Sequence, residues 1–353
     1  MISDPSSNNN DFIPVIHPWN QELWQQLTLE SERTNHALLF NGGSGLGKQA
    51  LAFSLAHNVL TQSSDEKQSQ SAALFNSASH PDLHVIMPEE EVAEDLLGRF
   101  ARRYLQPHGG KPRSNITIDQ IRTLANALTT HPHISKNRVI LIFHAHTMNR
   151  NAANALLKSL EEPPKDTLFI LVSDEVSKLA KTVRSRCSLI NFKTPDSDSA
   201  MSWLNNQEEI PESEIAAHLA MANNRPLLAL RMYQNDYLSA LKAVFTDVNN
   251  LWTRRAEPTQ VAKNWQEVGS ETSIDILQKL STDILRCSLS KDPKVVFFPV
   301  QKSWVQSVSA KLSRSKLLSV IDELIYAKRM LSTTVDELLV LEALSIKFNG
   351  LPS

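Results

Sequence analysis

Residues 36–60 read HALLFNGGSGLGKQALAFSLAHNVL, an apolar run followed by a glycine-rich loop and then a second apolar stretch. The first run has the length and composition of a buried strand, and the last has the periodicity of a helix. Between them, residues 42–48 fit the pattern G-x-x-x-x-G-K in the strand–loop–helix order that a phosphate-binding loop requires. The stretch therefore predicts an α/β fold of the P-loop type.

The loop itself supplies a candidate nucleotide site. Gly42, Gly45 and Gly47 would let backbone N–H groups point at phosphate oxygens, and Lys48 would reach the outer phosphates. The alternative is that these glycines only make a tight turn between strand and helix, with no ligand. The sequence predicts the fold and leaves nucleotide occupancy open.

Two positions that should help to hold Mg²⁺ carry unsuitable side chains. A working P-loop NTPase has Ser or Thr after the lysine, whereas this chain has Gln49. The apolar strand 138–143 should deliver acidic residues at its end, but His144 and His146 follow it. Mg²⁺ prefers oxygen ligands in octahedral geometry, which imidazole does not provide. We therefore expect ATP hydrolysis by this chain to be absent or very weak. We also expect no metal site, because a transition-metal site at the histidines would need a matching carboxylate or thiolate pattern.

Strands and helices alternate up to residue 195, which is typical of a mostly parallel sheet. Besides the first strand, apolar strands are predicted near 83–87, 138–143 and 168–172, and helices over 116–130 and 147–162. Residues 61–79 are rich in Ser and Gln and are expected to form a loop. Residues 89–115 carry an acidic half and then a basic half, which favours a solvated insertion.

Helical periodicity dominates after residue 195. Apolar stripes are formed by Leu277, Leu280, Ile284 and Cys287, and by Val335, Leu339, Ala343 and Ile346. The segment 295–300, VVFFPV, is limited to an edge strand or a loop by its proline. The chain is thus expected to be an α/β domain followed by helices.

Composition excludes several classes of protein. A length of 353 residues suggests two or three domains, and a formal net charge of -2 gives no global attraction to nucleic acid. Two cysteines cannot form a disulfide framework or a four-cysteine zinc site. Residues 1–12 are polar and expected to be loose, without the pattern of a secretory signal. With no apolar stretch of membrane-spanning length, we expect a cytoplasmic protein with no membrane partner.

Several motifs resemble those of clamp-loader subunits of the AAA+ family. Residues 151–164, NAANALLKSLEEPP, resemble the signature helix of that family, and residues 184–187, RSRC, resemble its Ser-Arg-Cys motif. The P-loop, the His-Pro-Asp segment 80–82 and the helix that begins ITIDQIRTL occur in the expected order. Together these motifs cover roughly residues 15–235.

The resemblance implies an AAA+ base domain over residues 1–193, a small helical lid over 194–238 and an all-α collar over 239–353 that joins subunits into a ring. It implies a subunit of the bacterial DNA polymerase III clamp loader that does not hydrolyse ATP. Its partners would be the ATPase subunits gamma or tau, the delta subunit, and the sliding clamp and primed DNA through the complex. The whole assembly belongs to a DNA-directed DNA polymerase, a nucleotidyltransferase.

The resemblance also assigns a role to Arg186. In clamp loaders the arginine of this motif projects across a subunit interface onto ATP bound by the neighbour, where it acts as an arginine finger. Ser185 would orient the turn, and Cys187 would be a small buried side chain. The alternative is that Arg186 is simply an exposed arginine on a loop.

Other residues in the segments that resemble the family can be interpreted in two ways. Lys158, Glu161 and Glu162 would face DNA or a neighbouring subunit, or Lys158 and Glu161 would form a surface pair three residues apart. Ser173 and Asp174 fall where related ATPases sense phosphate, and a carboxylate there would repel it. Arg225 lies near the position of a lid arginine but out of register.

Members of the family usually carry a zinc module between the P-loop helix and the His-Pro-Asp segment. Residues 61–79 contain no cysteine, so no zinc is expected, and ATP bound without hydrolysis is the one cofactor left open. A competing reading is an ATP-hydrolysing AAA+ motor with an atypical metal site. A third is direct DNA binding through the basic half of the insertion.

Overall fold

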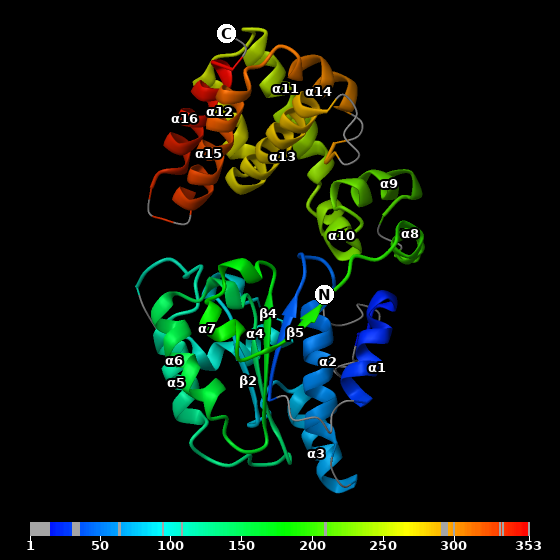
Figure 1. Cartoon of the computed structure of the whole chain (residues 1–353), viewed down its shortest axis with the longest axis vertical. Coiled ribbons are helices and arrows are strands. Elements are labelled where there is room, and N and C mark those ends of the chain that lie inside the picture. The colour runs from blue at the N-terminus through cyan, green and yellow to red at the C-terminus, as the bar shows by residue number, and fades with distance from the viewer. Residues whose placement is uncertain are drawn as a thin grey trace. The chain divides into compact units, whose positions relative to one another are not determined.

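The computed structural model describes residues 15–29, 36–62, 65–93, 95–106, 109–207, 210–290, 296–298, 301–331, 333 and 335–351. The chain forms two compact units, residues 1–195 and 196–353 (Figure 1). The expectation of a loose segment over residues 1–12 lies outside the described residues. None of the described helices combines the length and the apolar character that a membrane span needs.

The first unit is built on a parallel sheet of five strands in the order β2-β3-β4-β1-β5. This confirms the parallel sheet that the sequence predicts, whereas the strand order comes from the structure. Its strands are β1 (Ala37–Asn41), β2 (Leu83–Ile86), β3 (Arg138–Ile142), β4 (Thr167–Ser173) and β5 (Ser188–Asn191). Strand β5 was not predicted. It lies at the sheet edge with alternate residues exposed, so its sequence lacks the continuous apolar run of a central strand.

Successive side chains of a strand point to opposite faces of the sheet. Both faces are buried, because helices pack on each of them. Phe40 and Leu141 pack on the side of α2, whereas Leu39 and Ile140 pack on the side of α6. The first face is covered by α1 (Gln21–Leu29), α2 (Lys48–Thr61), α3 (Asp65–Asn76) and α4 (Leu96–Ala101). The second is covered by α5 (Ile118–Ala127), α6 (Arg150–Glu161) and α7 (Lys181–Arg184) (Figure 1).

Two loop predictions in this unit were wrong. The Ser- and Gln-rich segment 61–79 contains the helix α3, which buries Ser71 and Phe75 against its neighbours. The charged segment 89–115 is not a solvated excursion, because it contains α4 and inserts Leu97 and Phe100 into the core. In both segments a few buried residues stand among many polar ones, and that mixture hides the helical periodicity.

The His-Pro-Asp segment is a structural junction. The buried carboxylate of Asp82 accepts hydrogen bonds from the backbone amides of His133, Ile134 and Ser135 at 2.6, 2.8 and 2.9 Å. The His80 ring lies 2.8 Å from the Ser71 hydroxyl of α3. Burial lowers the pKa of His80 to about 4, so this imidazole is neutral near pH 7. The segment therefore ties the start of β2 to α3 and to the loop that precedes β3.

The second unit is helical, with one continuous hydrophobic core that extends from Ala200 to Leu351. Its helices are α8 (Ser197–Asn205), α9 (Glu212–Met221), α10 (Pro226–Gln234), α11 (Tyr237–Trp252), α12 (Pro258–Val268), α13 (Ser270–Leu289), α14 (Lys302–Ser309), α15 (Arg314–Leu331) and α16 (Glu337–Asn349). The division of this unit into lid and collar at residues 238 and 239 stays a prediction. Of the segment 295–300, the described residues 296–298 form no strand, and Asp283 accepts from the Phe297 and Phe298 amides.

The two apolar stripes noted in the sequence have opposite environments. Leu277, Leu280, Ile284 and Cys287 are all buried on α13. The other four residues, which we call the α16 stripe, are exposed: Val335 by 40%, Leu339 by 61% and Ile346 by 59%, with Ala343 also exposed. The prediction that all four lie on one helix was wrong for Val335, because α16 begins only at Glu337. Helix α16 buries a different face, which includes Leu341, Leu344 and Phe348. The α16 stripe is therefore an apolar surface of this unit.

Candidate phosphate site and interface arginine

The glycine loop between β1 and α2 is held against a short segment near the N-terminus. Gly47 has a left-handed backbone (φ +80°), and a Cβ atom there would lie 2.5 Å from Cδ2 of His17. The side chains of Trp19 and Asn20, from a 3₁₀ turn at Pro18–Asn20, donate to the Leu46 carbonyl at 3.0 and 2.8 Å. Glycine at position 47 is thus required both by its backbone conformation and by this close approach. This segment is not predictable from the sequence, because its residues carry no recognisable motif.

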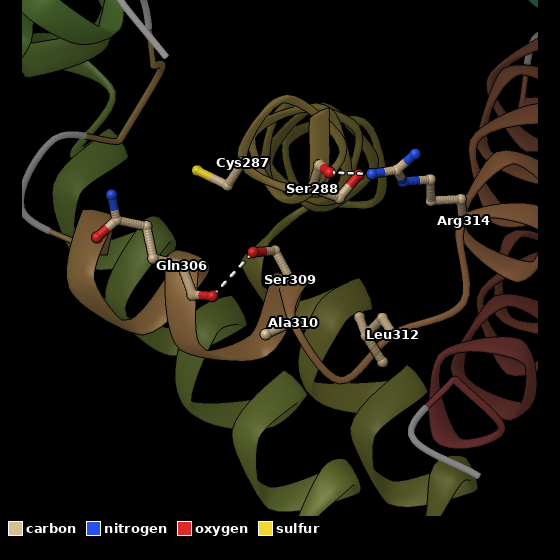
Figure 2. Close-up of a pocket in the computed structure, with 7 residues that line it drawn as sticks. All are labelled: Cys287, Ser288, Gln306, Ser309, Ala310, Leu312 and Arg314. Atoms are coloured by element: carbon tan, nitrogen blue, oxygen red, sulfur yellow. Dashed lines mark hydrogen bonds between the residues drawn. The ribbon is translucent and has the colours of Figure 1, made fainter. Parts of the chain in front are cut away.

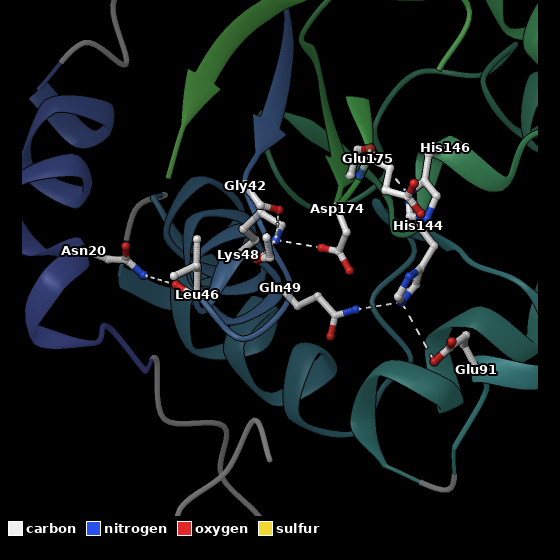
Figure 3. A network of polar contacts seen from close by, with 12 residues as sticks. Asn20, Gly42, Leu46, Lys48, Gln49, Glu91, His144, His146, Asp174 and Glu175 are labelled. Carbon is white, nitrogen blue, oxygen red and sulfur yellow. Dashed lines mark hydrogen bonds and ion pairs between the residues drawn. The ribbon is translucent and has the colours of Figure 1, made fainter. Parts of the chain in front are cut away.

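Lys48 is engaged by its own chain (Figure 3). Its ammonium donates to the carbonyls of Gly42 and Gly43, both at 2.6 Å, and forms an ion pair with Asp174 at 2.7 Å. The Lys48 side chain is only 4% exposed, so this charge is compensated in a sheltered place. The sequence predicts Asp174 near the phosphate position, and its carboxylate contacts the phosphate-loop lysine directly.

The positions that should supply metal ligands contact each other instead. The Gln49 amide lies 3.1 Å from Nε2 of His144, and the Glu91 carboxylate lies 3.9 Å from the same nitrogen (Figure 3). Glu91 comes from the charged insertion, in a 3₁₀ turn at Glu89–Glu91. His144 has only ring nitrogens to offer and the Gln49 amide is directed at that ring, so this pair does not supply the set of oxygen ligands that Mg²⁺ requires. The side chains present here do not fit that ion.

The second histidine after β3 is also explained by packing. His146 lies 3.3 Å from the Ser173 hydroxyl, and burial lowers the pKa of its imidazole. Among the residues that the structure describes, no three His, Cys, Asp or Glu side chains gather in a way that could hold a metal ion.

Arg186 follows α7 and is folded back onto its own domain. Its Nη1 donates to the Thr182 carbonyl at 2.8 Å and to the Ser185 hydroxyl at 3.3 Å. Its Nη2 forms an ion pair with Glu161, in the last turn of α6. About a third of the Arg186 side chain remains exposed. From the sequence, Lys158 is the expected partner of Glu161. The ion pair with Arg186 is not predictable from local spacing, because Glu161 and Arg186 are 25 positions apart.

Cys187 packs against the core beneath this arginine. Burial raises the pKa of its thiol to about 11, which makes it a small packing residue and not a reactive thiolate near neutral pH. The side chain is only partly buried, so it is less enclosed than the buried residue expected from the sequence.

Arg225 belongs to the second unit, where it precedes α10 and its Nε donates to the Ala222 carbonyl at 2.8 Å. The same unit has a cavity of about 490 Å³ between α13 and α14 (Figure 2). Its lining includes Cys287 and Arg314, and Arg314 donates to the Ser288 carbonyl. None of the candidate phosphate-binding or interface residues lines this cavity.

The parallel sheet in this strand order, with a phosphate loop after β1, defines a P-loop domain of the AAA+ class, here with a mismatched metal site. A family model described as "DNA polymerase III, delta subunit" matches residues 19–196, about half of the chain. The chain is 29% identical over 344 residues to DNA polymerase III subunit delta' of Pseudomonas aeruginosa, and this alignment covers 96% of this chain and 98% of that protein. It is 30% identical over 249 residues to the protein of the same name from Yersinia pestis, with 67% of each chain covered.

The chain belongs to the DNA polymerase III delta' family. Among solved structures, a gamma subunit-related protein of DNA polymerase III from Thermotoga maritima matches 94% of this chain and 99% of its own. The TM-score is 0.45 at 15% identity.

Proposed function

We propose that this clamp-loader subunit of DNA polymerase III does not hydrolyse ATP and supplies Arg186 to ATP held by a neighbouring ATPase subunit. The observation that carries the first half is the contact between Gln49 and His144, which occupies the two positions that should serve Mg²⁺. Without that ion, the charge that develops on a transferring phosphoryl group is not neutralised. The chain would then contribute to hydrolysis from outside the reacting site.

The proposal places the chain in the cytoplasm, in a ring with gamma or tau subunits and the delta subunit, which act together on the sliding clamp and primed DNA. Arg186 supports it because this guanidinium lies at the surface on a short connection between α7 and β5. No zinc takes part in the proposed role. A nucleotide entering the glycine loop would have to displace Asp174 from Lys48, and the freed carboxylate would repel its phosphates.

Purified chain should show no Mg²⁺-dependent ATP hydrolysis above background. The reason is that the Gln49 amide is paired with His144, which has only ring nitrogens to offer, and that Lys48 is engaged by Asp174. Release of phosphate should be measured with the wild-type chain and with Lys48→Ala, beside an active clamp-loader ATPase subunit as the positive control. Turnover by the wild-type chain that disappears in Lys48→Ala would instead support an ATP-hydrolysing motor with an atypical metal site.

The α16 stripe supports an assembly role for the second unit. Leu339, Ala343 and Ile346 form an exposed apolar row on one face of α16, and Val335 adds an exposed apolar side chain just before the helix begins. Such a row is uncommon on a monomeric surface. We propose that this row packs against an apolar helix face of a neighbouring ring subunit. Helix-on-helix packing of this kind excludes water from both faces and requires no change in the fold of α16.

Replacing Leu339 and Ile346 together by aspartate should weaken association with the ATPase subunits at least about tenfold, because two charges would enter an apolar contact. Copurification and sedimentation of the mixed subunits would measure this, and thermal unfolding of the lone chain should change little. Ser202→Asp adds a charge at an exposed position of α8 and should leave association unchanged. Normal association of the double variant would exclude the α16 stripe as the interface.

A further inference from the structure

We propose that Glu161 holds Arg186 in a retracted position and competes with the neighbour's ATP for its guanidinium. Glu161 would thus be a positioning residue, which sets how readily the arginine reaches across the interface. This inference rests on the proposed role of Arg186 and adds the residue that controls it.

The contacts of Arg186 define the retracted position. Both terminal nitrogens of the guanidinium are in use within the chain: Nη1 on the Thr182 carbonyl and the Ser185 hydroxyl, and Nη2 on Glu161. Both hydrogens of Nη1 are engaged in these contacts and one hydrogen of Nη2 is directed at Glu161, so the terminal nitrogens keep a single hydrogen for a phosphate while these contacts hold. The bond to Glu161 is the one that also removes charge, because a carboxylate next to the guanidinium cancels its positive field.

The two partners differ in how firmly they are held. Glu161 lies in the last turn of α6, where Leu160 is buried and its carbonyl contacts Nε2 of His36 at 2.8 Å. Arg186 lies on the connection that leads into an edge strand. A long side chain on a connection can therefore swing away from a carboxylate that is fixed at a helix end.

The ion pair between Glu161 and Arg186 is exposed enough to break and re-form easily. Half of the Glu161 side chain and a third of the Arg186 side chain are accessible, so water screens their attraction. Exposed ion pairs of this kind are weak, and releasing one changes an equilibrium by only about 1.5- to 5-fold. Glu161 would therefore tune the engagement of Arg186 without blocking it.

The retraction can be tested on the whole chain alone by labelling arginines with phenylglyoxal and mapping the products by mass spectrometry. Glu161→Gln should speed labelling of Arg186 about 1.5- to 5-fold, because its amide carries no charge. Arg184, which is exposed, serves as the reference within the same molecule and should not change. Glu162→Gln removes an adjacent exposed carboxylate and should alter neither rate. Equal labelling of Arg186 in the wild type and in Glu161→Gln would overturn the proposal.

The consequence for catalysis requires the reconstituted complex. Glu161→Gln should lower the KM for ATP by about 1.5- to 5-fold and leave kcat nearly unchanged, because saturating ATP draws Arg186 out in either case. A purely structural role would lower kcat instead. In an Arg186→Ala background, Glu161→Gln should have no effect on KM. An unchanged KM in Glu161→Gln would overturn the competition, provided that Arg186→Ala alone slows hydrolysis. If Arg186→Ala has no effect, the proposed role of Arg186 fails first.

Discussion

Replacing Arg186 by alanine should slow ATP hydrolysis at the adjoining site of the reconstituted clamp loader by about a thousandfold. An arginine that reaches the transferring phosphoryl group in trans offsets the charge that develops there, and losing such a residue lowers the rate by about 10³ to 10⁵. The total hydrolysis rate of the complex would fall only by the part that this one site contributes, since Arg186 does not act on the other ATPase sites. Single-turnover measurements with limiting ATP would separate the slow site from the others.

The neighbouring residues provide the control for this result. Arg184→Ala removes an exposed positive charge two positions away and should leave both assembly and hydrolysis intact. Arg186→Ala should also assemble normally, because the lost ion pair with Glu161 is half-exposed and contributes little to stability. A complex that assembles with Arg186→Ala and hydrolyses ATP at the wild-type rate would exclude the trans-acting role.

Asp82→Ala should lower the free energy of unfolding of the first unit by about 3–5 kcal/mol. The Asp82 carboxylate is fully buried and accepts three backbone amides, those of residues 133–135, and its removal leaves these donors without their acceptor. Charge-assisted hydrogen bonds contribute about 1.5–3 kcal/mol each, and breaking such a buried network lies at the large end of single-residue effects. Urea unfolding followed by circular dichroism would measure the change.

Asp119→Ala is the matched control, because it removes an exposed carboxylate from the first turn of α5 in the same unit. It should change stability by less than about 1 kcal/mol, the range expected for a charge near a helix end. A destabilisation by Asp82→Ala no larger than that of Asp119→Ala would show that the His-Pro-Asp junction is not a major source of stability.

Most of the first unit could be predicted from local sequence patterns. The strand–loop–helix order around Lys48 and the continuous apolar runs of β3 and β4 indicate a parallel sheet, because both faces of such strands are buried. The failures occur where burial involves only part of a segment. Helix α3 and the insertion that contains α4 bury a few residues each, and β5 is an edge strand with an exposed side.

The candidate phosphate site also has features that the sequence predicts and features that depend on the tertiary structure. The absence of suitable metal ligands at Gln49 and His144 is a matter of residue identity, so the sequence predicts it directly. The contact between those two side chains joins positions 95 apart in the chain, and the packing of α2 beside β3 places them together. The engagement of Lys48 by Asp174 likewise depends on β1 and β4 being neighbours in the sheet.

By itself, the sequence determined the P-loop fold, the family and the missing magnesium ligands, because each depends on residue type at short spacing. Tertiary structure alone decided that Glu161 holds Arg186, that Glu91 of the insertion approaches His144, and that the α16 stripe faces water. These features join residues far apart in the chain or depend on which helix face a neighbour covers. An apolar stripe looks the same in a sequence whether its partner lies in the same chain or in another subunit, since periodicity records the need for burial and not what supplies it.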